Sequence, residues 1–376
     1  MKKMHIALFF SLNFKAPHNN KKVIVAPMTL LEDLATGLHA KGHSVYFLTT
    51  KDSQDKPYYY RTPLFISTAR NPQIQKLAHQ GNTGEHIKLA AFYNQCAVKE
   101  FLKKHGKKLD IFNFHSIQYP LSLLYLNRYS FKSIFTLHDS SLNYYQKWVD
   151  LTRDLAIETR FSFISKKQAQ LINVPKKNVV YHGIKLNDYP FQRDADDYLA
   201  FSGRMIPEKG ALSAIRVAKK LKKHIQLAGS IPESQDEASY WYNKVKPSLN
   251  HGAKYLGLIP YNKMYTLYSR AKALLVPITW NEAFGLVMIE AMACGTPVIA
   301  FKHGSVPEVI KDKKTGFIVK NESQMIKAVK KIYDMPQNEY MQMRRNCRKH
   351  VEENFSVERM VNDYEKLYYK IVKSNR

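Results

Sequence analysis

Cysteine and glycine are both scarce in this 376-residue chain. The three cysteines (Cys96, Cys294 and Cys347) are odd in number and far apart, so they cannot form a disulfide framework or a cysteine-rich zinc site. Such cysteine usage is typical of a reducing compartment, and the sequence predicts a cytoplasmic protein. The 15 glycines follow no three-residue period, which excludes a collagen-like chain.

Long apolar runs are also missing. No stretch approaches the ~20 residues that a membrane-spanning helix needs. The apolar segment at 4–10 follows two lysines, but no small-residue cleavage site comes after it, so we expect a buried first strand rather than a signal peptide. Hydrophobic residues at 45% and charged residues at 24% are close to the averages of globular proteins and exclude wholesale disorder. At ~100–200 residues per domain, the length predicts two domains.

Acidic residues are few: 31 aspartates and glutamates against 58 lysines and arginines give a net charge of +27. Such a surface attracts nucleic acids, anionic lipids and phosphorylated substrates alike. We find no recognised nucleic-acid-binding motif, so we expect no nucleic-acid partner. Peripheral contact with an anionic membrane is one expectation, based on clustered lysines (Lys103, Lys104, Lys107, Lys108) and on the tyrosines at 58–60 between Lys56 and Arg61. The alternative is an enzyme that meets a small or phosphorylated acceptor in solution.

Short apolar runs alternate with amphipathic stretches along the whole chain. The first series of predicted strands is 4–10, 45–48, 111–114, 133–137 and 161–164, with helices at 29–41 and 86–104. The second series is 179–181, 198–201, 225–228, 273–277, 297–300 and 317–319, with helices at 211–222, 263–271 and 285–294. This order predicts an α/β protein with two parallel sheets, each covered on both faces. The polar, proline-containing stretch 173–193 predicts a boundary between domains 1–173 and 174–357, and a ligand cleft between them.

The stretch 280–297 carries the most chemical information. A strand ends near Pro277, a loop contains Glu282, and a helix begins near Gly285. The unpaired amides at the start of that helix suit a phosphate group. Glu290 lies ~7.5 Å further along the helix axis at 1.5 Å per residue. Two carboxylates therefore flank an anion site, and each can accept hydrogen bonds from vicinal hydroxyls, as a sugar, a diphosphate and a ribose in a row would require.

These residues closely resemble glycosyltransferase family 4, whose members are retaining enzymes of the GT-B fold. The resemblance rests on Glu282-x7-Glu290 with Phe-Gly-Leu after the first glutamate, on the continuation to Ile310, and on the segment 203–210, Gly-Arg-Met-Ile-Pro-Glu-Lys-Gly. It implies two facing Rossmann-like domains with a deep cleft, and a C-terminal helix at 358–376 that crosses back to the first domain. It also implies transfer of a hexosyl unit from a nucleoside-diphosphate sugar, with UDP favoured, to an acceptor hydroxyl. No metal and no resident cofactor are expected.

The resemblance also assigns roles to individual residues. Glu282 would hold hydroxyls of the donor sugar, Glu290 the ribose, and His115 or His138 would approach the sugar from the first domain. The diphosphate would be held by Arg204 and Lys209 beside Gly203, together with the amides of Phe284, Gly285 and Leu286. Fixed cations at this place stabilise the departing diphosphate more in the transition state than in the ground state.

The chain departs from the family pattern at three places. Val25, Ala26 and Pro27 stand where a Gly-Gly loop is usual, and His182 stands where asparagine is usual, at a predicted turn of the hinge. Asp194-Ala195-Asp196 resembles a metal-binding motif of another fold, but its position in a polar linker indicates a solvated loop. Two alternative functions remain open at this point: a GT-B nucleotide-sugar epimerase, and a non-catalytic protein that binds sugar nucleotides or nucleic acid. The acceptor cannot be identified from the sequence.

Overall fold

The structure is a computed structural model of the whole chain. It describes residues 2–10, 26–62, 83–115, 132–139, 160–174, 176–232, 234–249, 252–260 and 263–374, and between 71 and 153 also 71–72, 76, 146–147, 149–150 and 153. Of the predicted loop at 25–27, Val25 lies outside the described residues, whereas Ala26 and Pro27 already belong to the first turn of a helix.

The first domain is built on a seven-stranded parallel sheet with the order β3-β2-β1-β4-β5-β6-β7. Its elements are β1 (His5–Phe9), α1 (Ala26–Ala40), β2 (Ser44–Thr49), β3 (Tyr59–Arg61), α3 (Thr83–His105), β4 (Ile111–Phe114), β5 (Ser133–Leu137), β6 (Phe161–Phe163), α6 (Lys166–Leu171) and β7 (Lys177–Val179). The middle strands are apolar on both faces, as in β1, where Ile6 pairs in register with Ile111 of β4. Helices must therefore cover both faces of the sheet.

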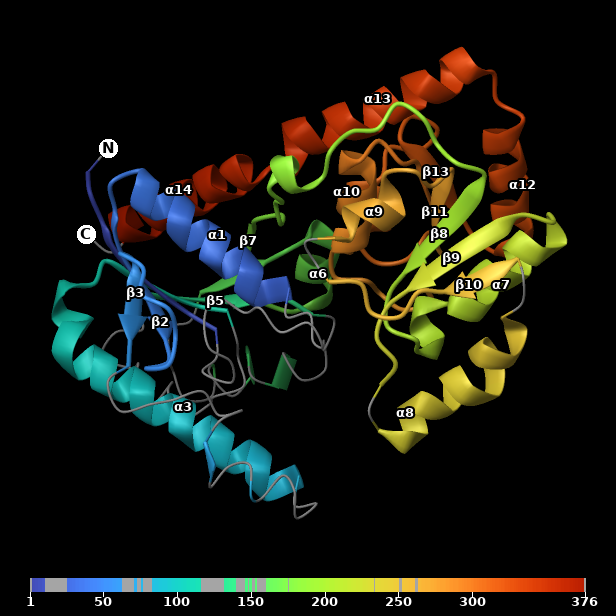
Figure 1. Cartoon of the computed structure of the whole chain (residues 1–376). Helices are drawn as coiled ribbons and strands as arrows, with labels where there is room; N and C mark the ends of the chain where they lie inside the picture. The colour runs from blue at the N-terminus through green and yellow to red at the C-terminus, as the bar shows by residue number, and fades with distance from the viewer. Residues whose placement is uncertain are drawn as a thin grey trace.

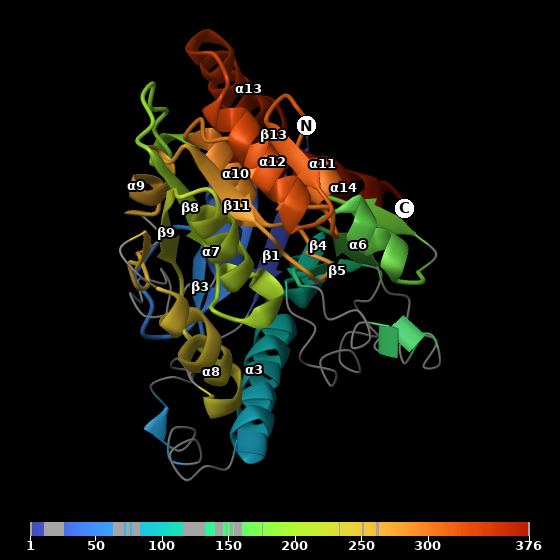
Figure 2. The same cartoon turned by 90° about the vertical axis from the view of Figure 1, so that its right-hand side faces the viewer.

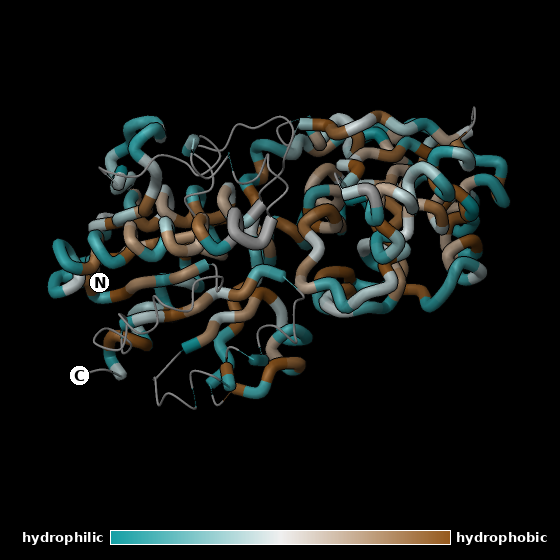
Figure 3. The backbone as a smooth tube through the Cα atoms, turned by 90° about the horizontal axis from the view of Figure 1, so that it is seen from below, coloured by the Kyte–Doolittle hydropathy of each residue, from teal (hydrophilic) through white to brown (hydrophobic). Residues whose placement is uncertain are grey.

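The second domain repeats this architecture with six parallel strands in the order β10-β9-β8-β11-β12-β13. Its elements are β8 (Tyr198–Ser202), α7 (Ala211–Lys220), β9 (His224–Ala228), α8 (Gln235–Tyr240), β10 (Ala253–Tyr255), α9 (Tyr265–Tyr268), β11 (Ala273–Val276), α10 (Leu286–Ala293), β12 (Val298–Phe301), α11 (Val306–Val309), β13 (Gly316–Val319), α12 (Glu322–Tyr333) and α13 (Gln337–Asn354). Two separate buried clusters line the two faces of this sheet. The hydropathy view shows brown, apolar strands inside both domains and teal segments around them (Figure 3).

The last helix, α14 (Val357–Ser374), returns to the first domain and packs beside α1 (Figure 1). Its apolar stripe, which includes Met360, Tyr364 and Tyr368, joins the core formed by β1 and α1. Gly37 of α1 allows the close approach, because a Cβ there would lie 2.5 Å from a methyl group of Val361. The predicted returning helix is therefore present.

The chain passes between the two domains near Ile184 and again near Ser356, and these two segments lie side by side. Ile184 and Ser356 form a parallel bridge, in which the Ile184 amide donates to the carbonyl of Phe355. Gly183 lies against the Ser356 backbone, where a Cβ would come within 2.2 Å of its carbonyl oxygen. These crossings are the natural hinge between the two sheets.

Two expectations need correction. The segment at 179–181 was expected to begin the second series of strands, and the boundary was placed at 173, but β7 pairs with β6 and completes the first sheet. The change of sheet therefore falls between Val179 and Tyr198. The tyrosines at 58–60 were expected at a lipid surface, but Tyr58 is buried and the rings of Tyr59 and Tyr60 pack on Phe47 and Phe101.

Candidate active site

A cavity of about 170 Å³ lies between the two domains, at the C-terminal ends of strands of both sheets. The first domain and the hinge contribute Pro27, Leu30, His138, Ile164 and His182. The second domain contributes Gly203 and Lys209 after β8, Glu282 after β11, and the start of α10 from Phe284 to Met288. Ligands of parallel α/β sheets gather at this edge. The structure thus brings most of the predicted site residues into one cavity.

Glu282 and Lys209 form the charged centre of this cavity. The Lys209 ammonium donates to the Glu282 carboxylate over 2.6 Å, although the two residues are 73 positions apart in the sequence. The indole of Trp280 completes the group, since its Nε1 donates to the same carboxylate at 3.3 Å and its ring lies 4.8 Å from the Lys209 nitrogen. A predicted phosphate-binding cation and a predicted sugar-binding carboxylate therefore touch each other.

The loop before α10 is held in a conformation that requires glycine. Gly285 caps the helix with φ +81°, and a Cβ there would lie 2.5 Å from the end of Met288. Gly304 has φ +54° and approaches the backbone of Glu282 so closely that a Cβ would meet the carbonyl oxygen at 2.2 Å. Ser305 then fixes the loop by donating its amide to the carbonyl of Glu282 and its hydroxyl to the carbonyl of Phe284. The helix amides are thus presented to the cavity by a rigid turn.

Glu290 lies behind the cavity rather than on its surface. Its side chain is buried on α10, and the hydroxyl of Tyr268 on α9 donates to its carboxylate at 3.1 Å. Burial raises the pKa of Glu290 to about 7, and the bond from Tyr268 offsets only part of that effect. The carboxyl group is therefore poised to change its charge near neutral pH.

Three histidines form a stacked row that leads from the first domain to the hinge. His115 Nδ1 lies 2.8 Å from His138 Nε2, and His138 Nδ1 lies 3.4 Å from His182 Nε2. Burial lowers the pKa of all three, that of His138 to about 4, so the row is neutral at pH 7. His138 and His182 line the cavity, whereas His115 is buried one position further from it. His182, which was predicted only at a turn of the hinge, is thus also part of the cavity wall.

Arg204 lies outside the main cavity. It lines an adjoining groove with Glu208, Asp236, Tyr240 and Trp280, and its guanidinium carbon is 5.9 Å from the Trp280 ring. The two predicted diphosphate cations, Arg204 and Lys209, therefore both lie close to the Trp280 ring. In the linker, Asp196 pairs with Arg270 at 2.6 Å, and among the described residues no cluster of three or more histidine, cysteine or acidic side chains is arranged to hold a metal.

Three further residues belong to the site, and sequence reasoning gave them no role in it. Trp280 stands two positions before Glu282. An indole beside a carboxylate that is predicted to bind a sugar is a signal from which Trp280 could have been assigned to the site. His182 was noticed only as a departure from the family. Tyr268 carries no sequence signal at all, because its contact with Glu290 depends on how α9 packs against α10.

Part of the chain matches a known protein family. Residues 189–353, which include Lys209, Glu282 and Glu290, match the family model described as glycosyl transferases group 1. Over 342 residues the chain is 26% identical to YtcC of Bacillus subtilis, which is named as a glycosyltransferase. The match covers 80% of this chain and 82% of that protein. The second half of the chain is therefore similar to this family.

Solved structures extend the similarity to both domains. Sucrose-phosphate synthase from Thermosynechococcus elongatus superposes with a TM-score of 0.76 at 20% identity, over 99% of this chain and all of that one. Anabaena HepE in complex with UDP gives a TM-score of 0.68 at 16% identity, over 98% of this chain. At such identities the likeness concerns the fold alone, and it confirms the predicted GT-B architecture.

Proposed function

We propose that this protein is a retaining glycosyltransferase of family 4 that moves a hexosyl unit from a nucleoside-diphosphate sugar, with UDP favoured, to an acceptor hydroxyl. The observation that carries the proposal is the meeting of Lys209, Glu282 and the N-terminus of α10 in one interdomain cavity. The related fold of Anabaena HepE, which has been solved with UDP-glucose, supports a donor of this kind.

The geometry suggests that these groups bind different parts of the donor. Lys209 and the amides of Phe284, Gly285 and Leu286 would neutralise the diphosphate, and Glu282 would accept hydrogen bonds from the sugar. The bond between the anomeric carbon and the phosphate oxygen breaks while a bond to the acceptor oxygen forms on the same face. The acceptor proton then passes to the departing diphosphate. On the opposite side, His138 and His182 would supply uncharged hydrogen-bonding groups, and His115 would hold His138 in place from behind.

A screen of nucleotide sugars tests the proposal directly. Thermal shift should identify a donor that stabilises the protein, and that donor should then release its nucleoside diphosphate when acceptor hydroxyl compounds are added. A GT-B epimerase has the same nucleotide site, but it would consume the donor without an acceptor. Stabilisation by no nucleotide sugar would contradict the proposal.

Donor binding should depend on the charge of Glu290. If ribose hydroxyls donate to its carboxylate, UDP binds the ionised form, so affinity should rise about 10-fold from pH 6 to pH 8, because a group with a pKa of about 7 is mostly protonated at pH 6. Calorimetric titration of UDP measures this, and Glu290→Gln is the control for the titration of UDP itself. Equal pH profiles for the two proteins would exclude Glu290 from the ribose site.

Transfer should continue in the presence of EDTA. In the proposed site the diphosphate is neutralised by lysine, arginine and helix amides, so chelation should change the initial rate less than twofold. The measurement compares rates with EDTA and with added Mn²⁺. Complete loss of activity that Mn²⁺ restores would instead indicate a metal site, for which Asp194 and Asp196 would be the first candidates.

The surplus positive charge suggests an acceptor at the inner face of an anionic membrane. Lys88, Phe92, Lys99 and Lys103 are exposed along one face of α3, with Phe92 at 59% exposure, and Lys104, Lys107 and Lys108 continue the basic region. Figure 2 shows that α3 extends away from the body of the molecule. Among the described helices, none has the length and apolar character needed to cross a bilayer. We therefore propose peripheral binding in the cytoplasm.

Flotation with liposomes should detect this contact. At ~1 kcal/mol per basic residue, four lysines give reversible binding to anionic but not to neutral vesicles. Reversing the charge at Lys103, Lys104, Lys107 and Lys108 should release the protein. The same reversal at exposed lysines of the second domain (Lys313, Lys314, Lys327 and Lys330) should not. If the unmodified protein stays in solution at ~0.15 M salt, the acceptor is a soluble molecule.

A further inference from the structure

Glu308 of the second domain makes a direct contact with the first domain. One carboxylate oxygen accepts the amide of Lys166 at 2.8 Å, and the other accepts the amide of Lys167 at 2.7 Å, both in the first turn of α6. The hydroxyl of Tyr181, in the hinge after β7, donates to the same carboxylate at 2.8 Å. All three donors lie outside the domain that carries the glutamate.

The α6 amides depend on this carboxylate. The first amides of a helix have no partner within it, and here the side chain of the N-cap residue, Ser165, accepts the amide of Gln168. The Glu308 carboxylate accepts the amides of Lys166 and Lys167, and it places a negative charge at the positive end of the helix dipole. When the domains move apart, these amides lose that acceptor, so the contact favours the closed arrangement.

The same segment of the second domain also holds the site. Ser305 lies in the turn just before α11, which carries Glu308, and its amide and hydroxyl bind the carbonyls of Glu282 and Phe284. The Ser305 carbonyl in turn accepts the amide of Glu308 at 2.8 Å. A short, hydrogen-bonded path therefore leads from α6 to the loop that contains Glu282.

The cavity beneath this contact is small. At about 170 Å³ it is below the ~300–1,000 Å³ usual for small-molecule sites, so the separation of the two domains decides how much room a nucleotide sugar has. The groups that it would meet, such as Lys209 and His138, lie on opposite walls of the cavity.

We infer that Glu308 is a positioning residue that closes the cleft by capping α6 and thereby sets the Glu282 loop against the first domain. The claim that closure positions the Glu282 loop for a bound donor rests on the proposed function. The claim that Glu308 closes the cleft does not. Glu308 does not touch the reacting atoms in this scheme. It acts through Ser305 and through the distance between the two sheets.

Two variants break the contact from opposite sides. Glu308→Gln keeps the size of the side chain but replaces one acceptor oxygen by a donor. Lys166→Pro removes an amide that Glu308 accepts, and it changes no residue of the second domain. The helix should tolerate this proline, because proline is favoured at the first position of a helix. Ser165, the residue before it, already has the extended backbone that a following proline requires, with φ −154° and ψ 158°. Glu339→Gln, at an exposed position of α13, is the matched control.

Distance measurement between spin labels tests closure without any substrate. With Cys96 replaced by serine, labels at the exposed positions Lys107→Cys and Lys254→Cys report on one domain each. We expect a longer and broader distance distribution in Glu308→Gln and in Lys166→Pro, and no larger effect when both are combined. Distributions equal to that of Glu339→Gln in both variants would overturn the inference.

Kinetics then separates closure from the proposed function. UDP affinity should change less than twofold in both variants, because Lys209 and Glu290 lie within the second domain, while kcat for transfer should fall about 10-fold. A protein that opens in both variants but transfers no sugar in its unmodified form would contradict the proposed function and leave closure by Glu308 standing. Unchanged kcat in an active enzyme would exclude any coupling of closure to the Glu282 loop.

Discussion

Replacing Lys209 by methionine should lower the rate of sugar transfer about 100-fold. One charge-assisted contact of about 1.5–3 kcal/mol acts most strongly on the departing diphosphate, and its loss corresponds to roughly 10–100-fold in rate. The substitution also removes one of two donors to the Glu282 carboxylate, which the ammonium contacts at 2.6 Å and the Trp280 indole at 3.3 Å. The carboxylate proposed to bind the sugar would then lose part of its orientation. Both effects lower the rate, so we expect a loss at the upper end of the ~10–100-fold range.

The measurement is kcat/KM with the best donor, together with UDP affinity. Lys209→Arg should retain part of the activity because the charge remains, although the planar guanidinium cannot reproduce the ammonium contact. Lys220→Met, at an exposed position at the end of α7, is the matched control and should be neutral. A Lys209→Met variant that keeps the full rate would remove the diphosphate role from this residue.

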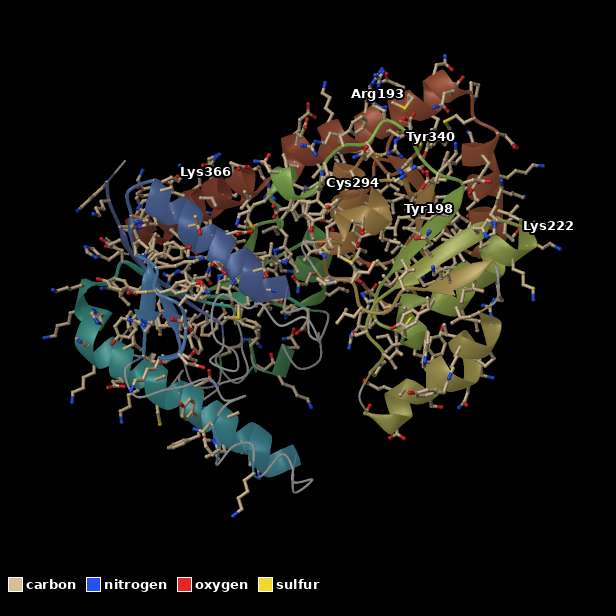
Figure 4. The ribbon with its side chains drawn as sticks, viewed as in Figure 1. Arg193, Tyr198, Lys222, Cys294, Tyr340 and Lys366 are labelled. Carbon is tan, nitrogen blue, oxygen red and sulfur yellow. The ribbon has the colours of Figure 1, made fainter. Side chains whose placement is uncertain are left out.

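Replacing Arg344 by leucine should destabilise the second domain by about 3 kcal/mol or more. Arg344 is completely buried on α13 and donates to the carbonyls of Gln192 and Ser269 and to the hydroxyl of Tyr340, which Figure 4 labels. The substitution leaves the carbonyl of Ser269 and the hydroxyl of Tyr340 buried without that donor, at about 1–3 kcal/mol for each unsatisfied group. The linker at 192 would also lose its attachment to α13.

Thermal unfolding measures this effect. At roughly 2–4 °C per kcal/mol for a domain of this size, the melting temperature should fall by about 6–12 °C. The neighbouring residue offers a control, because Arg345 is exposed, and Arg345→Leu should change stability by no more than about 0.5 kcal/mol. Equal melting temperatures for the two variants would show that the buried hydrogen bonds of Arg344 contribute little.

The sequence by itself determined the fold class and predicted most residues of the candidate site. Apolar runs such as 111–114 and 133–137 are local patterns, and they coincide with β4 and β5 because a strand buried on both faces must be apolar throughout. The turn around Gly285 was equally accessible, since the residues that bend the chain and start α10 are adjacent in sequence. The returning helix followed from the family resemblance, and α14 confirms it.

Only the tertiary structure decided which side chains meet. The pairing of Lys209 with Glu282, the burial of Glu290 under Tyr268 and the contact of Glu308 with α6 join residues far apart in the chain, and no local periodicity encodes such contacts. For the same reason β7 joined the first sheet and the tyrosines at 58–60 packed inward, against expectation. Hydrophobic patterning specifies that a segment is buried, whereas the partner it is buried against depends on the path of the whole chain.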